Sequence, residues 1–131
     1  PPRLKNSCQL LFLSLTEKFW PGPLTMVVPI SDEKKSFLKI NTIGLRIPRS
    51  LTAQSFITMT GPLATSSANI SGLSTSLSAH EVSKDLPDLD LLGPIPWEKC
   101  SGKASTVISW LKVGKWNLIR QGQISILKIN K

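Results

Sequence analysis

The chain has 131 residues, of which 40% are hydrophobic, and 16 Lys and Arg against eight Asp and Glu give it a formal net charge of +8. This length suits one globular domain, and no apolar run approaches the roughly 20 residues that a membrane-spanning helix needs. Two cysteines and one histidine do not offer the ligand count or spacing of a zinc centre, and the lone His80, on an expected helix surface, argues against a Cys–His catalytic site. Without a secretory signal pattern we expect a cytoplasmic protein.

The positive charge attracts polyanions such as RNA or nucleotide phosphates. The basic residues are nevertheless scattered, and Lys34 and Lys35 are the only adjacent pair. A generally basic, solvated surface therefore fits the charge as well as a nucleic-acid interface does.

The first third of the chain predicts a helix followed by a buried strand. Apolar residues recur every three or four positions from Leu4 to Phe19, and Pro21 ends this helical pattern. The segment from Trp20 to Pro23 is a turn. Leu24 to Ile30 is nearly all apolar and predicts a strand that is buried on both faces. A charged surface connection follows from Ser31 to Lys39.

A strand–helix–strand unit is predicted next. Thr42 to Pro48 alternates apolar and other residues, which places Arg46 on the opposite face from the apolar side chains. Ser50 is a plausible N-cap for a helix from Leu51 to about Met59, which Gly61 would end. Pro62 to Thr65 then predicts a short strand.

The segment from Thr65 to Gly72 is rich in hydroxyl residues and contains Asn69. Hydroxyls and an amide can hydrogen-bond a phosphate or carboxylate, and Gly72 lets the backbone approach closely. Since ligands of open α/β sheets sit at the carboxyl ends of strands, this is a candidate ligand loop. An ordinary surface loop has the same composition.

The second half begins with a capping box. Ser78 and Glu81 have the required spacing for a short helix to about Leu86, and Leu89 to Leu92 predicts a short strand before a turn at 93–97. His80 falls on this helix surface, where a structural role is expected.

Two further strands are predicted near the C-terminus, Thr106 to Trp110 and Trp116 to Arg120, after a small-residue loop at 102–105. The last apolar segment, at 124–127, is too short for strand and helix to be distinguished. The elements together indicate an α/β (mixed α+β) fold, with a twisted open mixed sheet, flanking helices and a ligand groove lined by the loops at 65–75 and 103–106.

Four stretches taken together resemble the YrdC/Sua5 family of threonylcarbamoyl-AMP synthases. The match spans about Phe19 to Gln123 and rests on Trp20-Pro21-Gly22-Pro23-Leu24-Thr25, Gly44-Leu45-Arg46-Ile47-Pro48, Ser67-Ala68-Asn69-Ile70-Ser71-Gly72, and Ser105-Thr106-Val107-Ile108 followed by Ile119-Arg120-Gln121-Gly122. Any one stretch would be weak, whereas the joint pattern is specific.

The resemblance implies condensation of L-threonine, bicarbonate and ATP to threonylcarbamoyl-adenylate, for later transfer to adenosine 37 of certain tRNAs by other proteins of that pathway. ATP would be a substrate carrying its own Mg²⁺. Such chemistry brings two anions together and needs cations and hydroxyl donors more than a protein nucleophile, so no catalytic residue is assigned. The alternative is a non-catalytic module of the same fold that binds tRNA, double-stranded RNA or a nucleotide.

The resemblance also implies roles for eight residues. ATP would contact Thr42, Ser67, Asn69, Thr75 and Arg120. Threonine would contact Arg46, Thr65 and Ser105, with Arg46 holding the carboxylate. A structural salt bridge for Arg46 and a plain turn hydroxyl for Ser105 are the alternatives.

The chain departs from the family pattern at its N-terminal side, where members carry a Lys-x-Arg motif before the Trp-Pro-Gly-Pro turn. Ser109 also stands where Asp is common, and Gln121 where Pro is common. We therefore expect residues 1–131 to be a single YrdC-like domain that is truncated at its N-terminus, with a degenerate copy of the domain as the alternative.

Overall fold

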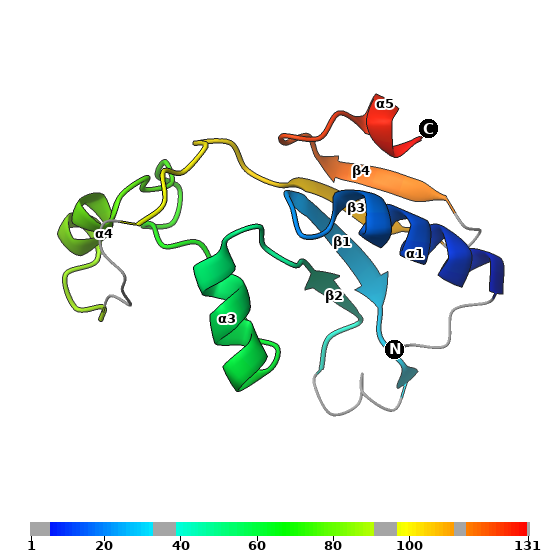
Figure 1. Ribbon diagram of the computed structural model, residues 1–131, viewed down its shortest axis with the longest axis horizontal. Helices are drawn as coiled ribbons and strands as arrows, with labels where there is room; N and C mark the ends of the chain where they lie inside the picture. The colour runs from blue at the N-terminus through cyan, green and yellow to red at the C-terminus, as the bar shows by residue number, and fades with distance from the viewer. Residues whose placement is uncertain (1–5, 33–38, 91–96, 112–114, 131) are drawn as a thin grey trace. The chain divides into compact units, whose positions relative to one another are not determined.

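The computed structural model describes residues 6–32, 39–90, 97–111 and 115–130 (Figure 1). The chain divides into two compact units. The first, which we call the sheet unit, comprises Pro1–Gln54 and Ala104–Lys131, and the second comprises Ser55–Lys103.

The sheet unit is built on four strands in the order β2-β1-β3-β4 (Figure 1). Their bounds are Leu24–Pro29 for β1, Thr42–Leu45 for β2, Thr106–Trp110 for β3 and Trp116–Arg120 for β4. The strand β1 pairs parallel with β3, while β1 with β2 and β3 with β4 are antiparallel. The predicted open mixed sheet is therefore confirmed.

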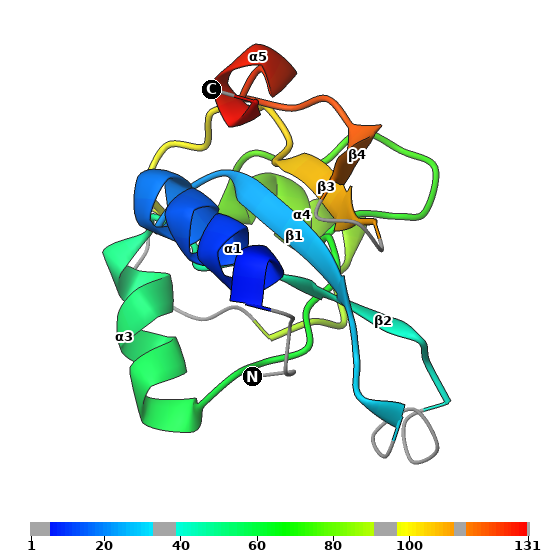
Figure 2. The ribbon, with the colours of Figure 1, turned by 90° about the vertical axis from the view of Figure 1, so that its right-hand side faces the viewer.

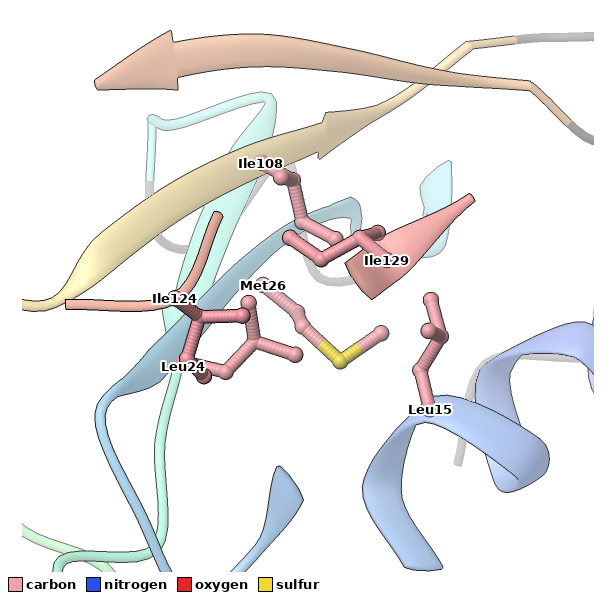
Figure 3. Packing of buried hydrophobic residues seen from close by; sticks show 6 residues of the cluster. All are labelled: Leu15, Leu24, Met26, Ile108, Ile124 and Ile129. Atoms are coloured by element: carbon pink, nitrogen blue, oxygen red, sulfur yellow. The ribbon is translucent and has the colours of Figure 1, made fainter. Parts of the chain in front are cut away.

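One face of this sheet carries the hydrophobic core. Helix α1 (Asn6–Phe19) and the short helix α5 (Ile126–Ile129) pack on this face, as two views of the ribbon show (Figures 1 and 2). In Figure 3, Leu15 of α1 and Ile129 of α5 point toward Met26 of β1, whose side chain is fully buried. The ambiguous last segment is thus a helix, capped by Ser125, whose Oγ accepts a hydrogen bond from the amide of Leu127.

The opposite face of the sheet is less buried than the core face. Along β1, Leu24, Met26 and Val28 are fully buried, whereas the alternate residues Thr25 and Val27 are only half-buried. The prediction of a strand buried on both faces is therefore wrong for this second face. Because cross-strand partners share a face, Thr25 lies beside Val107 of β3.

Helix α3 (Leu51–Thr60) confirms the helix predicted after Ser50. The Oγ of Ser50 accepts a hydrogen bond from the amide of Ala53 at 3.4 Å. Gly61 ends the helix with φ +80°, a conformation that glycine adopts without steric cost. Helix α3 has no buried residue.

Helix α4 (Ala79–Asp85) confirms the capping box in the second unit. The Oγ of Ser78 accepts a hydrogen bond from the amide of Glu81 at 3.2 Å. The Glu81 carboxylate reaches back one residue further than expected, where Oε2 accepts from the amide of Leu77 at 2.6 Å. Val82 on this helix is buried.

The structure corrects three predicted strands. Pro62 to Thr65 forms no strand: all four residues are exposed and have no strand partner within the described ranges, and an unpaired backbone segment gains no ladder hydrogen bonds. The strand predicted from Thr42 to Pro48 ends at Leu45.

The third correction concerns Leu89 to Leu92. Leu89 and Asp90 are not in a strand, and the amide of Leu89 donates to the carbonyl of Leu86 in a turn. The rest of that prediction, with most of the turn at 93–97, lies outside the described residues. Within the described ranges no helix is both long and apolar enough to cross a membrane.

Candidate functional site

Ser105 is the centre of a polar cluster in the sheet unit. It directly precedes β3 and is 7% exposed. The guanidinium of Arg120 donates to the Ser105 carbonyl from Nε at 3.2 Å and from Nη2 at 3.1 Å, and Nη2 also donates to the Ser105 Oγ at 3.2 Å. The Oγ1 of Thr25 is hydrogen-bonded to the same Ser105 Oγ at 2.9 Å. A serine hydroxyl, a threonine hydroxyl and a guanidinium are therefore linked.

The backbone around Ser105 is fixed by the segment that follows β4. The Oγ1 of Thr106 accepts hydrogen bonds from the amides of Gly122 and Ile124 at 3.0 Å each, and donates to the Ile124 carbonyl at 2.7 Å. A Cβ at Gly122 would collide with backbone atoms of residues 104–106. Glycine at this position therefore lets the two segments touch, and Thr106 joins them.

A β-bulge directs Arg120 toward Ser105. Ile108 pairs with Leu118, but Val107 pairs with Arg120, so β4 contributes one extra residue, Ile119. Simple alternation would have placed Arg120 on the core face together with Leu118. The bulge instead places it on the face of Val107 and Thr25, opposite the core.

Arg46 is held beside the turn that precedes β1. Its Nε donates to the carbonyl of Gly22 at 3.0 Å, and the amide of Gly22 donates to the carbonyl of Ile47 at 2.8 Å. Arg46 directly follows β2, in which Leu45 pairs with Met26. Continuing this antiparallel register by one residue places Arg46 level with Thr25, on the predicted side away from the core.

The surroundings of the Arg46 guanidinium, Arg120 included, disfavour its charge. The Arg46 side chain is exposed as a whole, but protein atoms crowd its charged head, and this desolvation, followed by the positive charge of Arg120, lowers the pKa of Arg46. Within the described ranges neither arginine has a carboxylate partner. Of the Arg46 donors, only Nε is engaged by a described residue, so both Nη groups are available for a planar anion.

Thr42 lies on the sheet but outside this cluster. It begins β2, is exposed, and pairs with Pro29 at the far end of β1 from Thr25. Alternation along β2 puts it on the same face as Gly44, away from the core. Of the four predicted site residues on the sheet unit, the structure brings Arg46, Ser105 and Arg120 together.

The other four predicted site residues belong to the second unit. Thr65, Ser67 and Thr75 are exposed. Asn69 holds its own loop, because its Nδ2 donates to the carbonyl of Ile70 at 3.0 Å and to that of Leu73 at 2.9 Å. Its Oδ1 is buried without a hydrogen-bond partner. Gly72, with φ +86°, provides the turn that closes the loop.

Two contributors to the cluster had no predicted role. Thr25 supplies a hydroxyl to Ser105, and Gly22 supplies a carbonyl to Arg46. Thr25 could have been noticed as the one polar side chain within an apolar strand. A polar side chain in such a position normally has a hydrogen-bond partner. Nothing in the sequence distinguishes the carbonyl of Gly22.

The donor set of the cluster is suited to anions. Hydroxyls and guanidiniums hydrogen-bond phosphate and carboxylate oxygens, and an arginine cannot ligate a metal ion. No group of three or more His, Cys, Asp or Glu residues that could hold a metal occurs in the part of the chain that the structure describes.

Comparison with known proteins connects this geometry to a family. A model of the Sua5/YciO/YrdC family, described as telomere recombination, matches residues 4–122. The threonylcarbamoyl-AMP synthase of Pyrococcus abyssi is 39% identical over 74 residues, which cover 54% of this chain and 22% of that protein. The threonylcarbamoyl-AMP synthase of Bos taurus is 37% identical over 117 residues, covering 82% of this chain and 42% of that protein.

A solved structure of a protein from the same family also matches this chain. The crystal structure of P. abyssi Sua5 complexed with L-threonine matches with a TM-score of 0.76 and 32% sequence identity, over 91% of this chain and 36% of that one. This chain thus spans less than half the length of the relatives and of the solved chain that it matches here. From the family match over most of its residues and the shared fold, the chain belongs to the Sua5/YciO/YrdC family.

Proposed function

We propose that this chain takes part in the synthesis of threonylcarbamoyl-adenylate from L-threonine, bicarbonate and ATP. The observation that carries the proposal is the cluster of Arg46, Ser105 and Arg120, in which two guanidiniums and a hydroxyl meet without a carboxylate among the described residues. Relatives named threonylcarbamoyl-AMP synthase and a family structure complexed with L-threonine support the choice of substrates.

The proposed chemistry needs two anions in one place. The amine of threonine and bicarbonate form a carbamate with loss of water, and a carbamate oxygen then attacks the α-phosphate of ATP and displaces pyrophosphate. Both reactants are negatively charged, so adjacent cations lower the cost of their approach and stabilise charge on the phosphate. Mg²⁺ would arrive with the ATP phosphates.

The two arginines would divide these tasks. The Nη groups of Arg46 suit the threonine carboxylate, because a guanidinium donates two parallel hydrogen bonds to such a group. Arg120 would approach the nucleotide phosphates while its Nε and Nη2 hold Ser105, which belongs with the threonine site. Within the described chain its Nη1 has no hydrogen-bond partner and is the group left for a phosphate oxygen.

The remaining assignments extend the same proposal. Thr65 would complete the threonine site, and the nucleotide would also contact Thr42, Ser67, Asn69 and Thr75. A tRNA acceptor and other proteins of its modification pathway would act on the product.

Pyrophosphate release tests the proposal. The intact protein that contains this segment should release pyrophosphate from ATP only when threonine and bicarbonate are both present. Omitting either component is the control. Pyrophosphate release that is independent of threonine would contradict the proposal. Salt-sensitive RNA binding without turnover would instead favour a binding module, because a net charge of +8 attracts polyanionic RNA.

A further inference from the structure

The hydroxyl of Thr25 has only one described side-chain partner, the Oγ of Ser105 at 2.9 Å. Thr25 lies on β1 between Leu24 and Met26, both of which are fully buried, so its backbone position is fixed by the core. It faces away from that core, toward the side of the sheet that holds Arg120. Its contact with Ser105 therefore joins a central strand of the sheet unit to the candidate site.

The donors and acceptors at Ser105 constrain what its hydroxyl can do. A serine hydroxyl offers one proton and two acceptor lone pairs. Arg120 Nη2 can only donate, so it occupies one lone pair. If Thr25 also donates, both lone pairs are used and the Ser105 proton is left for a ligand. If Ser105 donates to Thr25 instead, it can offer a ligand only a lone pair.

We infer that Thr25 is a positioning residue for threonine binding, which donates to Ser105 so that the Ser105 hydroxyl donates to an acceptor oxygen of the substrate. This inference rests on the proposed function. A carboxylate or carbamate oxygen accepts hydrogen bonds and cannot donate them, so substrate binding selects the arrangement in which Thr25 is the donor. The two donors on its oxygen also polarise the Ser105 hydroxyl and strengthen the bond that it donates.

A pair of substitutions separates the hydroxyl of Thr25 from its packing. Thr25→Val keeps the shape and removes the hydroxyl, whereas Thr25→Ser keeps the hydroxyl and removes the methyl group. Calorimetric titration of L-threonine into the intact protein should give an affinity roughly tenfold weaker for Thr25→Val and within about threefold of the unaltered protein for Thr25→Ser. Melting curves of both variants establish that they fold.

A double-mutant cycle tests whether Thr25 acts through Ser105. In a Ser105→Ala background, Thr25→Val should weaken threonine binding no further, because the hydroxyl that it orients is already gone. If Thr25→Val does not fold, Thr25→Ala replaces it throughout the cycle.

Four outcomes are decisive. Unchanged threonine affinity in Thr25→Val, equal losses in Thr25→Val and Thr25→Ser, or additive losses in the cycle would each overturn the positioning role while leaving the proposed function intact. An unaltered protein that binds no threonine would overturn the proposed function and the inference together.

Discussion

The sheet unit and the second unit present their predicted site residues in different ways. In the sheet unit, Ser105 and Arg120 are hydrogen-bonded to each other beside a core that buries residues from α1, β1, β3 and α5. In the second unit, Thr65, Ser67 and Thr75 are exposed, and among the described residues only Val82 is a buried hydrophobic side chain. The sheet unit thus holds predicted site residues in place by hydrogen bonds within the protein, whereas these three hydroxyl side chains of the second unit make no hydrogen bond to a described residue.

The chain has two methionines, one in each unit. Substituting them should give the largest difference in unfolding free energy between the two units. Met26 is fully buried in the sheet core, and Met59 on α3 is 85% exposed. Met26→Ala should lower the free energy of unfolding by about 2–5 kcal/mol, while Met59→Ala should change it by less than about 0.5 kcal/mol. Urea unfolding followed by tryptophan fluorescence measures both, since Trp20 and Trp116 pack against the core. Equal losses of unfolding free energy in the two variants would contradict the placement of the core in the sheet unit.

The second prediction concerns Arg120 as a ligand for the nucleotide. Arg120→Ala removes a charge-assisted hydrogen bond worth roughly 1.5–3 kcal/mol and should weaken ATP binding on the order of 10- to 100-fold. Arg49→Ala is the matched control, because it removes the same charge from an exposed position on the sheet unit. ATP affinity that is unchanged in Arg120→Ala, or that falls equally in both variants, would refute the assignment.

Two glycines offer the third comparison. At Gly122 a Cβ would collide with backbone atoms of residues 104–106, so Gly122→Ala should cost on the order of 1–3 kcal/mol and displace Ser105. At Gly61 a Cβ meets nothing within 4 Å, and only the positive φ of +80° opposes alanine, at a cost of about 1 kcal/mol. Urea unfolding ranks the two variants, and threonine titration should show a loss only for Gly122→Ala. The reverse ranking would mean that the contact at Gly122 is not close.

The smallest expected effect lies at the cap of α4. Ser78→Ala removes the hydrogen bond to the amide of Glu81 and should destabilise the helix by about 1 kcal/mol. Ser83→Ala, on the same helix, removes only a bond to the preceding turn and should be nearly neutral. Hydrogen exchange of the α4 amides distinguishes the two variants. Equal protection in both would show that the Ser78 cap does not stabilise the helix.

The sheet could be predicted from sequence because its strands carry a strong apolar pattern. Leu24, Met26 and Val28 alternate along β1, and all three are buried in the core. Pro62 to Thr65 has a similar but shorter apolar run, and it forms no strand because strand formation depends on a partner that local sequence does not reveal. The final apolar segment is too short for its sequence to distinguish a strand from a helix, and it is helical in the structure.

The site was predicted only in part. The resemblance identified Arg46, Ser105 and Arg120, which the structure brings together. It could not reveal how Arg120 reaches Ser105, because the bulge at Ile119 reverses the face that alternation assigns to Arg120. The role of Thr25 depends on parallel pairing between β1 and β3, which are separated by most of the chain. The ATP and threonine assignments themselves stay predictions.

Titration of L-threonine against substitutions of Arg46 tests the central claim most directly. If Arg46 clamps the carboxylate, Arg46→Lys should weaken binding nearly as much as Arg46→Ala, on the order of 10- to 100-fold, because a point charge cannot donate two parallel hydrogen bonds. Arg49→Ala, an exposed neighbour, should bind threonine normally. Normal threonine binding by Arg46→Lys, together with a lowered melting temperature for Arg46→Ala alone, would show that Arg46 supports only the turn at Gly22 and would contradict the account.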